Sequence, residues 1–79
     1  MALFYFHLHD RNGETRDLEG TELADLAAAR RHAVAEIRAL ISSDVRDGIF
    51  DLHGSLEITD AAGARLLRVG FAESLLRVI

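Results

Sequence analysis

The start of the chain has the two-residue period of a β-strand. Apolar and polar side chains alternate from Leu3 to Asp10. The apolar positions are Phe4, Phe6 and Leu8, and the polar positions are Tyr5, His7 and His9. Alternation puts the two sets on opposite faces of a strand, so we predict that one face packs on a core and the other meets water.

The dipeptide Asn12-Gly13 predicts that this strand turns back as a hairpin. A two-residue loop would set Leu18 on the face that carries His7. A three-residue loop, with the glycine in the left-handed conformation, instead pairs Phe6 with Leu18 and His7 with Asp17. We favour the three-residue loop because it buries Leu18.

A long helix follows. Asp25 precedes a run without glycine or proline and Gly48 closes it, which predicts a helix over residues 26–47 with Asp25 as N-cap and Gly48 as the C′ residue. Two charged residues, Arg30 and Asp44, fall inside its apolar stripe. The stripe itself steps by threes and fours through Leu26, Ala29, Ala33, Ile37, Leu40, Ile41 and Val45.

The remaining chain predicts a second hairpin, with strands over residues 55–59 and 64–71 around the loop Asp60-Ala61-Ala62-Gly63. This four-residue loop sets Leu56 opposite Leu67 and keeps the apolar residues of both strands on one side. Residues 73–79 could add a last helical turn or two.

These elements predict one α+β domain over residues 1–79 with the order ββαββ: a four-stranded antiparallel sheet with one long helix packed on one face. The strand order is left open. A single helix covers only one face of a sheet, so the other is predicted to be exposed. It would carry Tyr5, His7, His9, Thr15, Asp17, Glu57, Thr59, Leu66 and Arg68.

Composition narrows the function classes. The chain has 79 residues, a net charge of −4 and no cysteine, which excludes disulfides, thiolate zinc sites and cysteine nucleophiles. No apolar run reaches the roughly 18 residues of a membrane span, and the start lacks a basic signal-peptide region, so we expect a cytoplasmic protein. A chain of this size buries only about 60% of its surface. We therefore expect a homodimer.

Three residues are candidates for binding: His7, Asp17 and Arg30. His7 and His9 lie on one side of a strand, with the Asp17 carboxylate across from His7, and two imidazoles and an acid can hold a metal. No further ligand is evident, so we interpret them as polar residues of the exposed face and predict neither metal nor cofactor. Arg30 either extends its guanidinium to solvent or pairs with a carboxylate of Asp17, Glu19 or Glu57, as a clamp or as part of a small-anion or metabolite site with His7.

Other functions are disfavoured. Arg31, Arg38 and Arg46 share the outer arc of the helix and make a nucleic-acid-associated regulator the alternative function, but the chain is net acidic and has no nucleic-acid-binding motif. It also has no glycine-rich phosphate loop, nucleophile elbow or His-Glu-x-x-His motif, so we expect that it is not an enzyme.

Four segments resemble, in order and spacing, a family of short bacterial proteins known as domain of unknown function 6894. They are Phe4-Tyr5-Phe6-His7-Leu8, Asp17-Leu18-Glu19-Gly20 before Glu22-Leu23, Asp25-Leu26-Ala27-Ala28-Ala29-Arg30, and Leu56-Glu57-Ile58-Thr59-Asp60-Ala61-Ala62-Gly63. The resemblance runs from residue 4 to about 75 and aligns His7 and Arg30 with a family histidine and a family helix arginine. This chain departs from the family at His9, where members more often have arginine, and at Ala24, where they tend to have proline. The resemblance implies no activity, substrate or cofactor.

The leading hypothesis is a cytoplasmic, non-enzymatic interaction module that self-associates through the uncovered sheet face or a strand edge. We predict no membrane contact and leave any other protein partner open. His7, Asp17 and Arg30 are the residues predicted to form a binding site.

Overall fold

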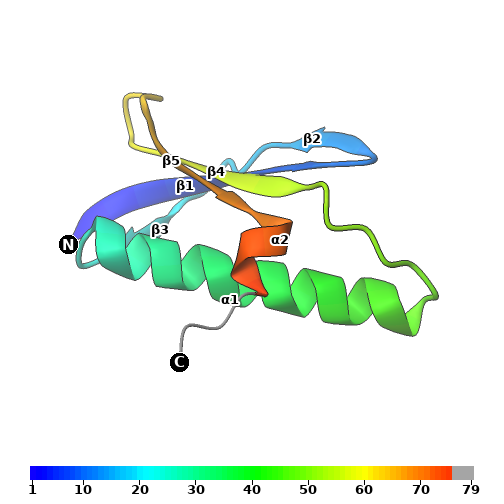
Figure 1. Ribbon diagram of the computed structural model, residues 1–79. Helices are drawn as coiled ribbons and strands as arrows, with labels where there is room; N and C mark the ends of the chain where they lie inside the picture. The colour runs from blue at the N-terminus through cyan, green and yellow to red at the C-terminus, as the bar shows by residue number, and fades with distance from the viewer. Residues whose placement is uncertain (76–79) are drawn as a thin grey trace.

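The computed structural model describes residues 1–75 as one antiparallel sheet with a long helix beneath it (Figure 1). The predicted α+β class and its ββαββ order are confirmed. The elements are β1 (Ala2–Asp10), β2 (Gly13–Thr15), β3 (Thr21–Leu23), α1 (Leu26–Arg46), β4 (Ser55–Thr59), β5 (Arg65–Gly70) and α2 (Phe71–Ser74). The predicted last helical turn over residues 73–79 lies partly outside the described residues.

The sheet order is β2-β1-β4-β5, and β3 pairs with β1. β2 and β3 are two pieces of the second strand that the sequence predicts, interrupted by residues 16–20. The sheet therefore has the four predicted strand positions, with β1 and β4 at its centre. The sequence left this strand order open. In the structure, β1 pairs with β2 and β3 within the first hairpin and joins that hairpin to β4 of the second.

The ends of α1 follow from local chemistry. The Asp25 carboxylate accepts the N–H of Ala28 at 2.8 Å and caps the first turn, as predicted. The last helical residue is Arg46, one before the predicted end, and Gly48 follows with a left-handed φ of 82°. Such a φ favours glycine because it lacks a Cβ.

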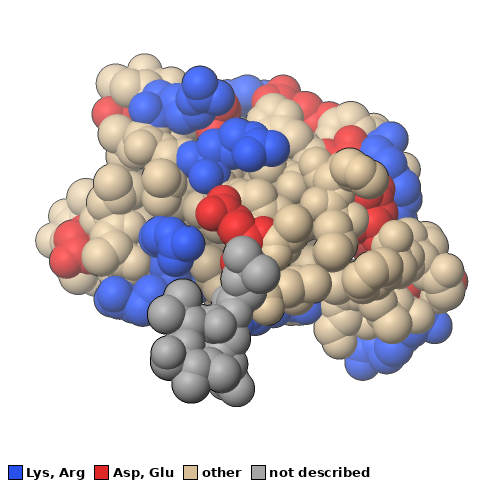
Figure 2. All heavy atoms as spheres, viewed as in Figure 1, with Lys and Arg blue, Asp and Glu red and all other residues tan. Residues whose placement is uncertain are grey.

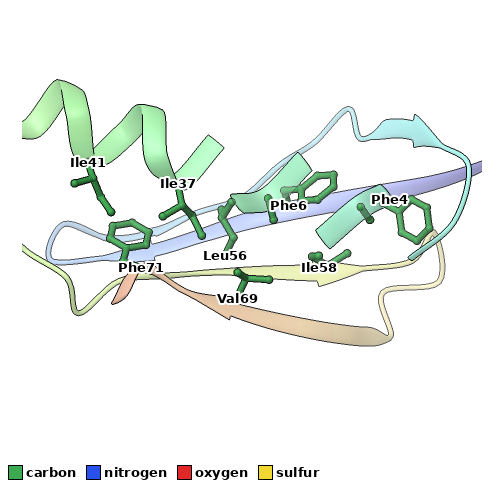
Figure 3. Close-up of a cluster of buried hydrophobic side chains, with 10 residues drawn as sticks. Phe4, Phe6, Ile37, Ile41, Leu56, Ile58, Val69 and Phe71 are labelled. Carbon is green, nitrogen blue, oxygen red and sulfur yellow. The ribbon is translucent and has the colours of Figure 1, made fainter. Parts of the chain in front are cut away.

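The core lies between α1 and one face of the sheet (Figure 3). Its members are Phe4, Phe6, Ala29, Ala33, Ile37, Ile41, Leu56, Ile58, Val69 and Phe71. Three residues of the predicted stripe, Leu26, Leu40 and Val45, are exposed instead. Leu26 and Val45 lie in the end turns of α1, and Leu40 faces an open groove beside β1.

The predicted register of the first hairpin is wrong by one residue. Asp10 pairs with Gly13, so the loop holds two residues, and Thr15 lies opposite Leu8 on the helix-facing side. The Asp10 carboxylate closes this turn by accepting the N–H of Asn12 at 2.9 Å. Leu18, predicted to bury opposite Phe6, is 85% exposed because the chain has left the ladder there.

The predicted register of the second hairpin is wrong by two residues. Leu56 lies opposite Val69 rather than Leu67, because the loop includes Ala64 and a bulge between Ile58 and Thr59 adds another residue on β5. The two extra residues together leave the side chains from Leu67 to Val69 on their predicted faces, whereas Arg65, before the bulge, lies opposite Thr59 rather than Ile58 and so changes face. The strand ends at Gly70, before the predicted end at Phe71, which begins α2.

Candidate functional site

His7 lies on the sheet face opposite α1, but the prediction that it is exposed there is wrong: the Asp17 backbone and Thr59 engage both ring nitrogens, and the residue is buried. Only 3% of it is exposed, and its ring stacks on that of Tyr5 with centroids 6.3 Å apart. Its Nδ1 lies 3.1 Å from the backbone nitrogen of Asp17, and its Nε2 lies 3.1 Å from the Thr59 hydroxyl. A backbone N–H can only donate, so Nδ1 accepts and the neutral ring carries its proton on Nε2, which donates to Thr59.

Asp17 organises the segment that interrupts the second strand. One carboxylate oxygen accepts the N–H of Phe6 at 3.1 Å, and the other accepts those of Glu19 and Gly20, each at 3.1 Å. Burial raises the pKa of Asp17, but the hydrogen bonds from Gly20, Phe6 and Glu19 outweigh it and hold that pKa below the usual aspartate value. The carboxylate is therefore the ionised anchor of residues 16–20.

Gly20 is required where this segment rejoins the sheet. Its φ is 74°, and an added Cβ would lie 3.0 Å from the Leu3 side chain and 3.1 Å from the Phe4 carbonyl oxygen. A larger residue would push the segment away from β1 and weaken the hydrogen bonds to Asp17.

The contact between Thr59 and His7 has the spacing of a nucleophile and its base, but the proton is in the wrong place. A base must accept the hydroxyl proton on Nε2, and here Nε2 already carries a proton because Nδ1 accepts from Asp17. The arrangement instead fastens residues 16–20 to the sheet. Both ring nitrogens are engaged, and within residues 1–75 no group of three or more His, Cys, Asp or Glu side chains is placed to hold a metal ion.

The structure brings together two of the three predicted site residues. His7 and Asp17 meet, although through the Asp17 backbone and not as the predicted cross-strand pair. Arg30 does not join them, because it is an exposed residue of α1 and α1 packs on the other face of the sheet. Within residues 1–75, its side chain forms no ion pair with Asp17, Glu19 or Glu57, the partners considered from the sequence.

The open sheet face carries charges of both signs around a hollow of about 500 Å³. Strand residues form its floor, with Glu57 3.6 Å from Arg65. Asp51 and His53, from the loop between α1 and β4, form one wall. Hydrogen bonds from the His53 backbone and imidazole, each 2.9 Å, lower the pKa of Asp51. Sequence reasoning missed this wall because residues 49–53 have no periodic pattern.

A scan against family models matches residues 3–72 to "Domain of unknown function (DUF6894)". The chain belongs to the DUF6894 family. No curated protein matches it, and no solved structure matches it. Within residues 1–75, this DUF6894 chain has no helix that is long and apolar enough to cross a membrane.

Ala24 and His9, the two positions where the resemblance predicts other residues, lie outside the contacts of His7. After Ala24, Asp25 has the extended conformation and the hydrogen bond of an N-cap. His9 lies 3.5 Å from Glu14, the residue opposite it on β2. The feature centred on His7 and Asp17 is therefore independent of both positions.

The outer arginines of α1 form no common site with His7. Arg38 donates from Nε to the Ser74 carbonyl at 2.8 Å and ties α1 to α2. On the side of the molecule seen in Figure 2, basic and acidic side chains are interspersed and do not gather by sign. This distribution does not favour a polyanion over other partners.

Proposed function

We propose that this DUF6894 protein is a non-enzymatic interaction module that self-associates through the sheet face opposite α1. The observation that carries the proposal is the charge pattern around the hollow on that face. Three carboxylates and three guanidinium groups line it: Asp10, Asp51, Glu57, Arg11, Arg65 and Arg68.

A two-fold interface places a surface against a copy of itself. A surface of one sign would repel its copy, whereas a mixed surface can pair each group with an opposite charge. Several of these groups already pair within the chain, as Arg65 does with Glu57. Within residues 1–75 Arg68 forms no ion pair, which leaves its guanidinium available to a carboxylate of a second copy.

The uncovered face supports the same proposal. Both helices of residues 1–75 pack on the side of Phe4 and Phe6, and no helix or strand of these residues lies over the opposite face of β4 and β5, although His7 and Thr59 on that face are buried. A small chain gains stability when a second copy covers such a face, because association adds buried area. Enzymatic chemistry is not part of the proposal, since the proton on His7 Nε2 points at Thr59.

Light scattering after size-exclusion chromatography tests self-association. At ~100 µM, a concentration at which a micromolar complex is largely formed, the wild type is expected at twice its monomer mass. Arg68→Glu places a carboxylate among the acids of the hollow and is expected to give the monomer. Arg31→Glu makes the same charge change on the exposed face of α1 and serves as the control, which is expected to remain dimeric.

A wild type that remains monomeric overturns the proposal. A dimer that survives Arg68→Glu contradicts the assigned face. Fluorescence anisotropy with generic DNA and RNA at low salt covers the alternative of a nucleic-acid-associated regulator. Binding that Arg31→Glu removes and Arg68→Glu leaves unchanged would favour that alternative instead.

A further inference from the structure

A second concave surface is lined by residues of α1 and of the β1–β2 hairpin. It is a groove of about 480 Å³ with a mainly apolar lining. The sheet contributes Phe6, Leu8 and Leu56, and α1 contributes Ala39, Leu40 and Ser43. The hollow of the open sheet face shares none of these residues.

The groove exists because β2 extends the sheet past the region that α1 covers. α1 packs chiefly against β3, β4, β5 and α2. Phe6 points toward α1 in Figure 3, and His32 covers part of its ring with centroids 4.8 Å apart. Beyond His32 the helix-facing side of β1 and β2 is open, which is why Leu40 stays 36% exposed although it belongs to the apolar stripe.

The rim of the groove is acidic. Asp17 and Glu36 lie on it, and Glu19 lines the adjoining hollow next to them. Within residues 1–75, Arg16 is the one arginine of the rim, and it lies 3.2 Å from Glu14; Glu36 lies 3.2 Å from the His32 imidazole. The hydrogen bonds that lower the pKa of Asp17 keep this carboxylate charged at neutral pH.

Leu18 extends the apolar surface beyond the groove. It lines the adjoining hollow beside Asp17 and Glu19, and it is held out in solvent by the segment that Asp17 anchors. An exposed leucine between two carboxylates offers contact to an apolar side chain that is followed or preceded by a basic one.

We propose that this groove binds a basic amphipathic segment of a partner protein, with an apolar side chain seated against Phe6 and Leu40 and lysine or arginine side chains at Asp17, Glu19 and Glu36. The acidic rim disfavours nucleic acids and anionic ligands, since their charge would meet carboxylates. The apolar floor disfavours a purely polar ligand, which would lose its water without gaining hydrogen bonds. This binding does not depend on the proposed self-association, because the two surfaces are separate.

Fluorescence anisotropy with labelled model peptides tests the proposal. The probe is an amphipathic peptide of leucine and lysine, about 15 residues long so that it can form a helix, and its counterpart has glutamate at each lysine. The full chain is expected to bind the basic peptide and not the acidic one. Ala39→Arg fills the groove from its exposed wall and is expected to weaken binding about tenfold, equivalent to about 1.4 kcal/mol.

Ala35→Arg is the matched control. It makes the same change one turn earlier on α1, at an exposed position that does not line the groove. Both variants add one positive charge, so a general electrostatic attraction would weaken equally in both, and only a groove site distinguishes them. Circular dichroism establishes that both variants keep their helix.

Three outcomes overturn the proposal. The first is equal weakening of binding by Ala39→Arg and Ala35→Arg, and the second is equal binding of the basic and acidic peptides. The third is no binding at ~1 mM protein, a concentration that detects interactions of about 4 kcal/mol or stronger. Light scattering separates the groove from self-association. A mass that falls to the monomer in Ala39→Arg alone would assign the groove to a second copy of this chain and contradict the partner proposed here. An unchanged mass together with lost peptide binding supports it.

Discussion

The two faces of the sheet come from the same strands and are built by different means. On the face toward α1, Phe6 and Ile58 lie on adjacent strands and bury aliphatic and aromatic surface. On the opposite face, Glu57 and His7 form the neighbouring cross-strand pair, and hydrogen bonds and ion pairs dominate there. The stability of the first face depends on the buried area and on the fit of its side chains. The stability of the second depends on specific pairs of polar groups.

The comparison shows where stability and specificity reside in this chain. Apolar burial is non-directional and scales with the area removed from water. A polar contact such as that of His7 with the Asp17 backbone requires one geometry, and loss of either partner leaves a buried group without a hydrogen bond. The two faces should therefore respond differently to substitution.

The largest effect is expected from Ile58→Ala. Ile58 is 0% exposed at the centre of the core, and truncation should leave a cavity and cost about 3–4 kcal/mol of unfolding free energy, measured by urea denaturation. Glu57→Gln, one residue away on the other face, should change it by less than about 1 kcal/mol, because an exposed ion pair contributes little. If Ile58→Ala does not fold, Ile58→Val, at about 1 kcal/mol, gives a measurable loss at the same position. A loss from Glu57→Gln as large as that from Ile58→Ala, or larger than that from Ile58→Val, would contradict the distinction between the faces.

An intermediate effect is expected from His7→Leu. This change fills the buried position with an apolar side chain but leaves the Asp17 N–H and the Thr59 hydroxyl unpaired, at a cost of about 2 kcal/mol of unfolding free energy, measured by urea denaturation. Hydrogen exchange should also show faster exchange of the Asp17 amide. Thr59→Val removes one partner only and is the comparison variant. A His7→Leu protein as stable as the wild type would mean that the ring does not fasten residues 16–20.

The smallest effect is expected from Asp17→Asn, and it should depend on pH. The pKa of Asp17 is lower in the folded chain than in the unfolded one, so its stabilisation is present above the unfolded value of about 3.9 and is lost as pH falls through the lower folded value. At neutral pH the variant should lose about 1 kcal/mol from weaker hydrogen bonds. The difference from wild type should shrink below about pH 4, as seen in thermal melts across pH. A difference that stays constant with pH would exclude the ionised anchor.

The helix and the assignment of most residues to faces could be predicted from the sequence. Asp25 and Gly48 mark the helix ends by local chemistry, and the alternation along β1 is long enough to fix its faces. The second hairpin shows why faces survive errors of register. Beyond the bulge its register is displaced by two residues, and a displacement of two returns the side chains from Leu67 to Val69 to the same side.

The first hairpin shows the opposite case. A displacement of one residue moves Thr15 to the helix side, and Leu18 is exposed where the chain leaves the ladder. The predicted register assumes that Leu18 is buried. Instead, the Asp17 carboxylate accepts the N–H groups of Glu19 and Gly20, and this tight segment takes Leu18 away from the sheet. The sequence Asp-Leu-Glu-Gly carries a signal for such a turn, in an aspartate that can accept nearby backbone N–H groups and a glycine that can adopt positive φ.

The candidate site could be predicted only in part. His7 and Asp17 were expected together, but a contact between an imidazole and a backbone N–H leaves no pattern in side-chain types. The separation of Arg30 from them depends on which sheet face α1 covers, and the residues of α1 alone do not specify that. The apolar groove also escaped prediction, because it arises from the width of the sheet relative to the single helix.

The bulge in β5 and the extra loop residue Ala64 have a consequence for how such chains can vary in length. Without the bulge, the extra loop residue alone would turn the following strand inside out and present Val69 to water. A single inserted amino acid must therefore be matched by a bulge, whereas an inserted pair only lengthens the tip.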